Sequence, residues 1–365
     1  MLTFLNLQPE IFGLDINDLS IKVAKLRKKR AGFYLVSLNE VIMKPGIVKE
    51  GVILDKEALV KHIKVALSTV KGERLGTNYA AMSLPEERSF SQVIQMPKMT
   101  QGELKTAVPF EAENYIPLPI ENVYLDFQEI DVHGQDSSVN HMDLLINVMP
   151  KNIVDSYLYC SKKAGLVPCI MEVESQAIVT ALVKNKKILE PTIFIDLGQD
   201  NTSFIIFSGG SIRFTSSLSV YSGQFTKAIS EKLGIDANEA EKLKIMCGLV
   251  PGKEKKYNVK QCLDPILYGL ASEIKKYINF YKGHVGHEYF YSDKKIEKII
   301  LSGGGAYLKG LAKFLSDEIA IPVEFGDPFI NVQVSKDRSL RITREKALSF
   351  TTAIGLALRG ANNEI

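Results

Sequence analysis

The chain has 365 residues, about two and a half times the length of a typical single domain, so two hydrophobic cores or one core with an insertion are expected. Hydrophobic residues make up 45% and charged residues 24% of the chain, which excludes disordered, fibrous and collagen-like proteins. The formal net charge of +3 is too small to indicate nucleic acid as a partner.

Four dispersed cysteines without a C-x-x-C pair favour reduced thiols over a disulfide scaffold. No stretch reaches the roughly 18 to 20 apolar residues that a membrane-spanning helix needs. Residues 1–9 lack the charge and apolar pattern of a signal peptide. These features predict a cytoplasmic protein without a direct membrane span.

The chain begins with strand-like alternation, and the turn residues Asn17 and Asp18 predict a hairpin. An amphipathic helix follows, with Asp55 as its expected N-cap. The predicted elements of this part are strands at Ile11–Ile16, Ser20–Leu26 and Gly32–Met43, the helix at Leu54–Val70 and a strand at Tyr79–Leu84.

Residues 86–150 are richer in proline and predict a small inserted α+β subdomain. Its expected elements are a helix at Thr100–Tyr115, strands at Val123–Val132 and Met142–Met149, and a polar turn at His133–Asn140. After it we expect a helix at Lys151–Ala164, a strand at Val167–Glu172 and a helix at Glu174–Leu189.

At Pro191 the opening pattern repeats: an apolar strand with Asp near its end, a turn rich in Asn, Asp and Gly, and a strand with a hydroxyl residue. This internal repeat predicts two paired lobes. The expected strands are Thr192–Leu197, Thr202–Phe207, Ser211–Ser217 and Lys298–Leu301; the expected helices are Ser222–Leu233, Asp236–Cys247, Leu263–Tyr281, Tyr307–Ile319 and Arg344–Arg359.

The two Asp-bearing hairpins have the chemistry of a polyphosphate site. Backbone N–H groups of such turns form concave anion sites when the backbone can adopt positive φ. Asp15 and Asp196 could each hold Mg²⁺ directly or through water, and Lys22 would add a positive charge. The loop Gly303–Gly305, at an expected strand-to-helix junction, would let a nucleobase and an α-phosphate approach the backbone.

Three segments resemble the two phosphate motifs and the adenosine motif of the actin-like ATPase superfamily: Gly13-Leu-Asp-Ile-Asn-Asp-Leu-Ser-Ile-Lys22, Ile195-Asp-Leu-Gly-Gln-Asp-Asn-Thr-Ser203 and Ile300-Leu-Ser-Gly-Gly-Gly-Ala306. Within it, the chain resembles the family of type IV pilus assembly protein PilM, relatives of the division protein FtsA. Further support comes from Ala240-Glu-Lys-Leu-Lys244 and Thr352-Ala-Ile-Gly-Leu-Ala-Leu-Arg-Gly360. The resemblance covers essentially the whole chain.

It implies an α/β fold, the actin-like (ribonuclease H-like) two-lobed ATPase fold, with a small α+β insertion in the first lobe. The implied divisions are 1–85 and 151–190 for the first lobe, 86–150 for the inserted subdomain, 191–343 for the second lobe with the adenosine motif, and 344–365 for a C-terminal helix returning to the first lobe.

The resemblance also implies an ATP site with Mg²⁺ held through water by Asp15 and Asp196. Glu241 would reach the ribose, Lys244 would lie near the adenine, and Glu174 would position water. The implied nucleotide-binding residues are Asp15, Asn17, Ser20, Lys22, Asp196, Gly198, Asn201, Thr202, Glu241, Lys244, Gly303, Gly304 and Gly305.

Two departures from the family pattern affect the first hairpin. Asn17 stands where most relatives have Gly, so a left-handed turn there would carry a conformational cost. Asp18 adds a carboxylate that would repel phosphates unless a metal or Lys22 compensates. Because Glu174 also lies in an unusual context, ATP binding is expected rather than efficient hydrolysis, with at most weak ATPase activity.

The implied function is a cytoplasmic ATP-binding scaffold, peripheral to the inner membrane. It would hold the N-terminal tail of a PilN-like bitopic membrane protein in a groove between the first lobe and the insertion. Binding of other pilus assembly components, and assembly into a homo-oligomer or a filament, are further possibilities. The segment Leu5-Asn-Leu-Gln-Pro9 resembles the docking element of that tail, although a flexible leader is favoured.

Two alternatives come from other classes. An FtsA-like division or cytoskeletal filament protein would carry a basic amphipathic membrane helix, which is not expected after Asn362. A sugar or acetate kinase would need an Asp base and extra substrate-binding segments, which the proline-rich segment 86–150 does not offer.

Overall fold

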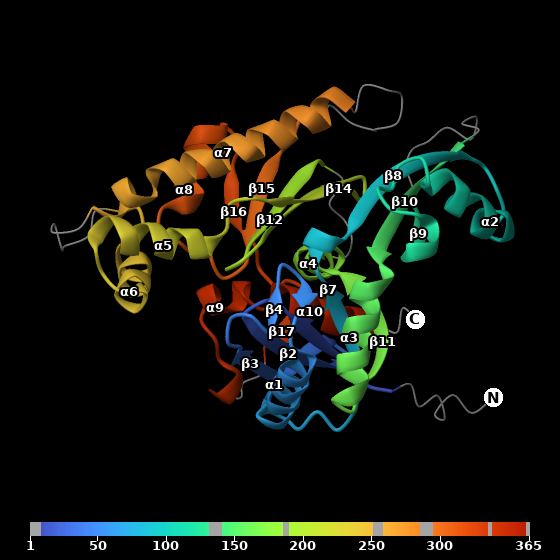
Figure 1. Cartoon of the computed structure of the whole chain (residues 1–365), viewed down its shortest axis with the longest axis horizontal. Helices are drawn as coiled ribbons and strands as arrows, with labels where there is room; N and C mark the ends of the chain where they lie inside the picture. Colours follow the sequence, from blue (N-terminus) through green and yellow to red (C-terminus); the bar gives the residue numbers. More distant parts are fainter. Residues whose placement is uncertain are drawn as a thin grey trace.

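The computed structural model describes residues 9–130, 141–184, 190–250, 258–284, 295–334 and 338–362. The leader before Pro9, the turn expected at His133–Asn140, and the expected ends of a strand at Val132 and of a helix at Leu189 lie outside these ranges. Figure 1 shows two α/β lobes stacked on each other, with the elements of residues 86–150 beside the second lobe.

The first lobe is built on a seven-stranded mixed sheet in the order β11-β7-β1-β2-β3-β17, with β6 also paired to β3. Its strands are β1 (Phe12–Ile16), β2 (Ser20–Lys29), β3 (Gly32–Ile42), β6 (Lys71–Gly72), β7 (Tyr79–Leu84), β11 (Val167–Val173) and β17 (Val332–Val334). A small hairpin is formed by β4 (Val48–Lys49) and β5 (Val52–Ile53).

Helices cover both faces of this sheet. One buried cluster joins it to α1 (Lys56–Ser68) and α3 (Lys151–Lys163). The other face packs against α4 (Glu174–Leu182) and α10 (Thr351–Ala361). The N-cap prediction for α1 is confirmed, because the Asp55 carboxylate accepts a hydrogen bond from the Ala58 N–H at 2.9 Å.

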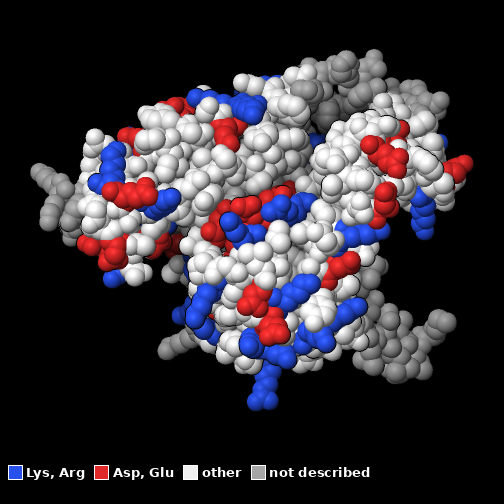
Figure 2. All heavy atoms as spheres, viewed as in Figure 1, with Lys and Arg blue, Asp and Glu red and all other residues white. Residues whose placement is uncertain are grey.

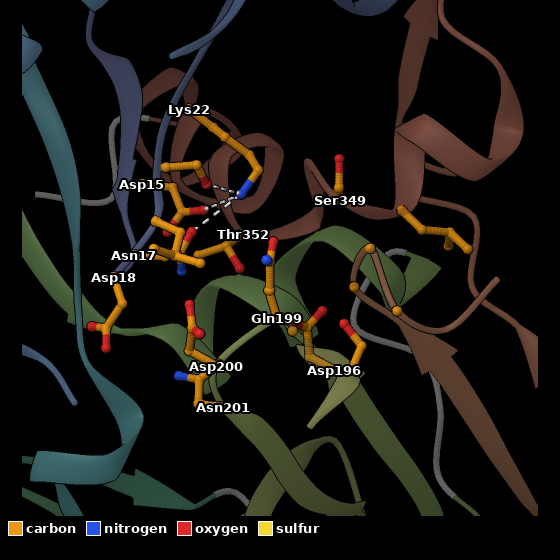
Figure 3. Close-up of a pocket in the computed structure, with 18 of the residues that line it drawn as sticks. Asp15, Asn17, Asp18, Lys22, Asp196, Gln199, Asp200, Asn201, Ser349 and Thr352 are labelled. Atoms are coloured by element: carbon orange, nitrogen blue, oxygen red, sulfur yellow. Dashed lines mark hydrogen bonds and ion pairs between the residues drawn. The ribbon is translucent and has the colours of Figure 1, made fainter. Parts of the chain in front are cut away.

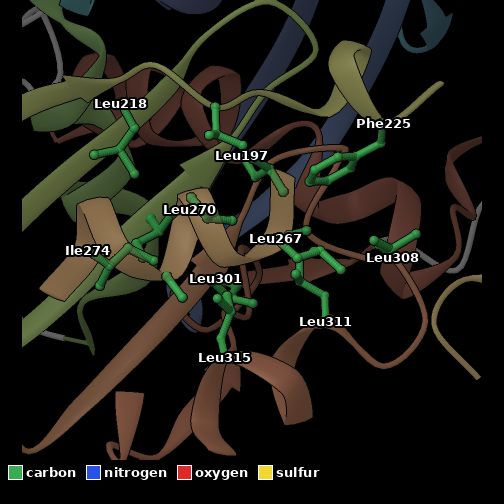
Figure 4. Close-up of a cluster of buried hydrophobic side chains, with 14 of the residues drawn as sticks. Leu197, Leu218, Phe225, Leu267, Leu270, Ile274, Leu301, Leu308, Leu311 and Leu315 are labelled. Atoms are coloured by element: carbon green, nitrogen blue, oxygen red, sulfur yellow. The ribbon is translucent and has the colours of Figure 1, made fainter. Parts of the chain in front are cut away.

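The strands of the second lobe and those of the insertion form one eight-stranded sheet in the order β16-β15-β12-β13-β14-β8-β10-β9. Its own strands are β12 (Thr192–Leu197), β13 (Thr202–Ser208), β14 (Ser211–Leu218), β15 (Lys298–Ser302) and β16 (Val323–Phe325), and its helices are α5 (Ser222–Leu233), α6 (Ala237–Cys247), α7 (Val259–His284) and α8 (Leu311–Ile319). Leucine and aromatic side chains from these helices and strands form its core, of which Figure 4 shows the centre.

The internal repeat is confirmed in the topology. In the first lobe, β1 pairs antiparallel with β2 and parallel with β7. In the second lobe, β12 pairs antiparallel with β13 and parallel with β15. Asp15 on β1 and Asp196 on β12 therefore each lie on a strand that has one antiparallel and one parallel neighbour.

The inserted elements are β8 (Phe90–Pro97), α2 (Gln101–Ala112), β9 (Val123–Ile130) and β10 (His141–Pro150). The helix begins with a capping box between Thr100 and Glu103 and packs Leu104 and Val108 onto the sheet. The sheet of the insertion joins that of the second lobe through one β8–β14 pair, Gln92 with Phe214. Sequence reasoning did not predict this junction.

Several expected boundaries were wrong. The helix expected from Tyr307 begins at Leu311, because Gly310 is left-handed with φ of 88°. The last helix is two helices, α9 (Arg344–Leu348) and α10, and the helix expected to reach Leu189 ends at Leu182. Strands β8, β16 and β17 were not predicted, and the chain returns to the sheet of the first lobe at Val332, before the expected return at residue 344.

Candidate functional site

A cavity of about 870 Å³ lies between the two lobes. Figure 2 shows acidic side chains gathered in the hollow between the lobes, with basic side chains beside them. Of the residues predicted for the site, all but Thr202 line this cavity: Asp15, Asn17, Ser20, Lys22, Glu174, Asp196, Gly198, Asn201, Glu241, Lys244, Gly303, Gly304 and Gly305.

The two aspartates are held in equivalent ways by the parallel neighbour of each central strand. Ser83 on β7 donates its hydroxyl to Asp15 Oδ1 at 3.0 Å. Ser302 on β15 donates its hydroxyl to Asp196 Oδ1 at 2.6 Å. Each carboxylate is thereby fixed in orientation by a serine that sequence reasoning did not identify. Ser302 directly precedes the glycine loop, so the adenosine motif could have identified it. Ser83 lies on β7 outside any motif, so nothing in the sequence pointed to it.

Burial dominates the electrostatics of these carboxyls. It raises the pKa of Asp196 to about 6, with a further rise from the charge of Asp15 and opposition from the Ser302 hydrogen bond. Burial also raises the pKa of Asp15, although Lys22 and Ser83 oppose that shift. Both carboxyls thus bind protons more tightly than free aspartate does, and a bound cation would relieve their mutual repulsion.

Lys22 is fixed by the first hairpin. Its ammonium donates to Ser20 Oγ at 2.9 Å and to Asn17 Oδ1 at 3.1 Å, and lies 3.9 Å from Asp15 Oδ2 (Figure 3). Asn17 does not adopt the left-handed conformation whose cost was considered above, because within the described ranges only Glu50 and Ala320 are non-glycine residues with positive φ. Asn17 instead serves as a side-chain partner of Lys22.

Asp18 does not point at the place expected for phosphates. Its carboxylate accepts the backbone N–H of Glu50 at 2.5 Å and of Gly51 at 3.1 Å, at the β4–β5 turn. Glu50 has φ of 49° and Gly51 φ of 72°, so this acceptor stabilises a turn that L-residues rarely adopt. Figure 3 shows the Asp18 carboxylate directed away from Lys22 and Asp15, although Asp18 lines the same cavity.

Glu174 lies between the two hairpins. Its Oε1 accepts from Asn17 Nδ2 at 3.0 Å, and its Oε2 lies 3.4 Å from Asn201 Nδ2. Burial, followed by the charges of Glu87 and Asp15, raises the pKa of Glu174 well above its ordinary value. A single side chain from α4 thus contacts the phosphate hairpins of both lobes.

The second hairpin is closed by a hydrogen bond from Gly198 N–H to the Asn201 carbonyl at 2.9 Å. A Cβ on Gly198 would lie 2.8 Å from Asn201 O and Oδ1, so glycine is needed for this turn. Thr202 is fully buried within β13, and among the described residues its hydroxyl has no hydrogen-bond partner. The structure therefore does not bring Thr202 into the cavity, contrary to the prediction.

Glu241 and Lys244 lie one turn apart on α6. Lys244 Nζ lies 2.7 Å from Glu241 Oε2 and donates to Thr226 Oγ1 at 2.9 Å. Thr226 Oγ1 donates in turn to Glu241 Oε2 at 2.5 Å. This triad, bridging α5 and α6, presents one carboxylate and one ammonium at the rim of the cavity.

The glycine loop differs from its expected role. A Cβ on Gly303 would lie 2.5 Å from Leu197 O, and one on Gly305 would lie 2.4 Å from Ser222 Cβ, so both glycines permit close protein packing. Only Gly304 has room, with Ser349 Cβ at 3.6 Å as its nearest neighbour. Because α8 begins at Leu311, the loop does not lie at a helix N-terminus.

Sequence reasoning also missed several polar residues at the cavity. They include Glu87, Gln199, Asp200, Lys346, Ser349 and Thr352. Burial, together with the charges of Asp18 and Glu87, raises the pKa of Asp200 to about 6. Within the described ranges, no group of three or more His, Cys, Asp or Glu side chains is placed to hold a metal directly.

Two carboxylates with raised pKa values, one fixed ammonium and the open space at Gly304 suit a polyphosphate that arrives with a hydrated divalent cation. Mg²⁺ keeps several waters and takes few protein carboxylates, so this donor set fits it. In the part of the chain that the structure describes, no helix has the length and hydropathy needed to cross a bilayer.

Comparison with known proteins places the chain in context. A family model described as type IV pilus assembly protein PilM matches residues 13–361. Among curated proteins, the cell division protein FtsA of Neisseria meningitidis serogroup B is 22% identical over 374 aligned positions, which cover 98% of this chain and 79% of FtsA.

Two solved structures share the fold. The PilM–PilN type IV pilus biogenesis complex superposes with a TM-score of 0.80 at 26% identity, covering 97% of this chain and 99% of the matched chain. MreB5 of Spiroplasma citri bound to ADP gives a TM-score of 0.52 at 14% identity, covering 97% of this chain and all of the matched chain. The predicted actin-like fold is thus confirmed.

Proposed function

Because this chain belongs to the family of type IV pilus assembly protein PilM, we propose that it is an ATP-binding scaffold of the type IV pilus assembly complex that binds the N-terminal cytoplasmic tail of a PilN-like membrane protein. The observation that carries this proposal is the likeness, over 97% of the chain, to the PilM–PilN complex. The tail would give the scaffold its place at the cytoplasmic face of the inner membrane.

In this proposal the cavity between the lobes holds Mg·ATP. Lys22 would contact the phosphates from one hairpin, and the backbone of Gly198–Asn201 would contact them from the other. Glu241 would accept from the ribose, Lys244 would lie at the base, and Gly304 would leave room for it. What supports these roles is that all these residues line one cavity.

Mg²⁺, when bound, would neutralise phosphate charge. Asp15 and Asp196 would hold its waters with the carboxylate oxygens that the serines leave free, since Ser83 and Ser302 each donate to one oxygen only. The ADP-bound state of MreB5, a fold relative, is consistent with nucleotide binding in this fold.

Weak or absent hydrolysis is part of the proposal. Glu174 is the residue expected to position the attacking water. Its two carboxylate oxygens already accept hydrogen bonds from Asn17 and Asn201, and burial raises its pKa well above the ordinary value. These contacts compete with a water molecule for the same oxygens, which favours binding over turnover.

The affinity for Mg·ATP should rise with pH. A carboxyl with pKa of about 6, as for Asp196, is about 10% ionised at pH 5 and about 90% at pH 7. Because protons compete with the cation, the dissociation constant should fall up to roughly tenfold between these pH values, as calorimetric titration at pH 5, 6 and 7 can measure. The Asp200→Asn variant should keep this trend; a flat profile in the wild type would contradict the role of Asp196.

The partner is tested directly with a peptide that copies the first cytoplasmic residues of the PilN-like protein encoded by the same organism. We expect saturable binding in a calorimetric or fluorescence titration, because such tails bind through a few apolar anchors and backbone hydrogen bonds. A peptide of the same composition in scrambled order is the control. Absence of binding both with and without Mg·ATP would refute the scaffold proposal.

A further inference from the structure

The turn Glu86–Arg88, here called the junction turn, is where the chain leaves the first lobe for the inserted subdomain. It is a 3₁₀ turn that follows Pro85 and leads directly into β8. Its three side chains contact elements of both lobes. None of them was predicted to have a functional role.

Glu87 reaches the second phosphate hairpin. Its Oε2 accepts a hydrogen bond from Asn201 Nδ2 at 3.0 Å. The Asn201 carbonyl closes that hairpin by accepting from Gly198 N–H. The position of Asn201, and with it the shape of the hairpin, is therefore tied to a carboxylate from the junction turn.

Arg88 reaches the first phosphate hairpin in two steps. Its Nε donates to the Glu50 carbonyl at 2.7 Å. The N–H groups of Glu50 and Gly51 donate to the carboxylate of Asp18, which belongs to the first hairpin. The same three-residue turn is thus hydrogen-bonded toward the hairpins of both lobes.

Glu86 anchors the turn at its base. Its Oε2 accepts from the Ser175 N–H at 3.1 Å, at the start of α4. It is 3% exposed, so this anchor is shielded from water. The first residue of the turn is thereby fixed to α4 of the first lobe, and it also has a side-chain hydrogen bond with Thr215 on β14.

The insertion beyond the turn pairs more extensively within itself than with the second lobe. Strand β8 pairs with β10 at eight positions, from Phe90 to Pro97. Strand β8 pairs with β14 at one position, and Arg213 on β14 also forms a buried ion pair with Asp143 on β10, with 3.8 Å between the charged atoms. A small change at the junction turn would thus move β8, β10 and α2 together.

We infer that Glu87 is a positioning residue that links the phosphate site to the inserted subdomain, so that Mg·ATP in the cleft shifts the insertion through Asn201 and the junction turn. This inference rests on the proposed nucleotide binding. Phosphates held between the hairpins would lie near Asn17, Asn201 and Glu174, which line the cavity, and any adjustment of Asn201 would be passed to Glu87 through their hydrogen bond. A partner groove between the first lobe and the insertion, which the family resemblance implies, would then respond to nucleotide.

The test is hydrogen exchange of the full chain with and without saturating Mg·ATP. In the wild type, amides of β8 and β10 should change their exchange rates about fivefold or more on nucleotide binding. Glu87→Gln keeps an oxygen that can accept from Asn201 and should keep this response. Glu87→Ala lacks the acceptor and should lose it, although Mg·ATP still raises its melting temperature.

Glu129→Ala, an exposed change on β9 of the same insertion, is the matched control and should respond as the wild type does. A full response in Glu87→Ala would overturn the inference. So would an unchanged exchange rate in a wild type whose melting temperature rises with Mg·ATP. No rise in melting temperature would instead refute nucleotide binding itself, and the inference with it.

Discussion

Asp196→Asn should remove most of the thermal stabilisation that Mg·ATP gives, without weakening the unliganded protein. Loss of a carboxylate that holds the waters of a metal ion costs about 10–100-fold in affinity. At a ligand concentration 100 times the wild-type dissociation constant, the stabilisation should fall from about 2.7 kcal/mol to as little as about 0.4 kcal/mol. Differential scanning fluorimetry with and without Mg·ATP measures both values.

The unliganded variant should be at least as stable as the wild type at pH 7.5. Because burial raises the pKa of Asp196 from 3.8 to about 6 in the folded protein, the folded state binds the proton more tightly than the unfolded state. Stability from this group therefore falls as pH rises through that window and is absent above it. Asparagine removes the buried charge and keeps an oxygen that can accept from Ser302.

Asp317→Asn is the control, because this aspartate is exposed on α8 and pairs with Lys313 far from the cavity. It should change neither melting temperature nor the response to Mg·ATP. A full Mg·ATP response in Asp196→Asn would show that the cleft assignment is wrong. A large loss of stability in the unliganded variant would contradict the electrostatic argument.

Local sequence patterns were sufficient for the central strands and their hairpins. An apolar run that ends near Asp15 or Asp196, followed by turn residues, fixes both the strand and the position of its carboxylate, as the pairing of β1 with β2 and of β12 with β13 confirms. The Asp55 cap was predicted for the same reason, since the capping carboxylate and the backbone N–H that donates to it lie within three residues.

Contacts between distant segments could not be predicted in this way. Ser83 meets Asp15 only because β7 pairs in parallel with β1 in one register, 68 residues along the chain. The sequence around Asp18 does not indicate its hydrogen bond to the β4–β5 turn. The sequence around Glu87 likewise does not indicate its hydrogen bond to Asn201. Thr202 was expected to line the second phosphate hairpin but is buried away from the cavity, because a position in a strand does not say which face its side chain lies on.

Helix α10 crosses α4 closely at Gly355. Gly355 on α10 lies against α4: a Cβ at this position would be 1.8 Å from the Ala177 carbonyl oxygen and 2.6 Å from its carbon. Across the same helix, a Cβ on Gly13 of β1 would be 2.2 Å from the Ala353 carbonyl oxygen. Helix α10 is therefore held between the sheet and α4 with no space for a methyl group on either side.

Gly355→Ala should destabilise the protein by about 3 kcal/mol or more, at the upper end for overpacked cores, because the atoms in the way are backbone atoms that cannot rotate aside. Gly269→Ala, in α7, is the matched control: its nearest neighbour would be Val220 Cγ2 at 4.0 Å. That change should be neutral or stabilise by up to about 1 kcal/mol, through the helix propensity of alanine. Urea unfolding monitored by circular dichroism compares the two. Equal urea midpoints for the two variants would mean that α10 and α4 do not cross as closely as described. The placement of Thr352 at the cavity, which depends on the position of α10, would then also be wrong.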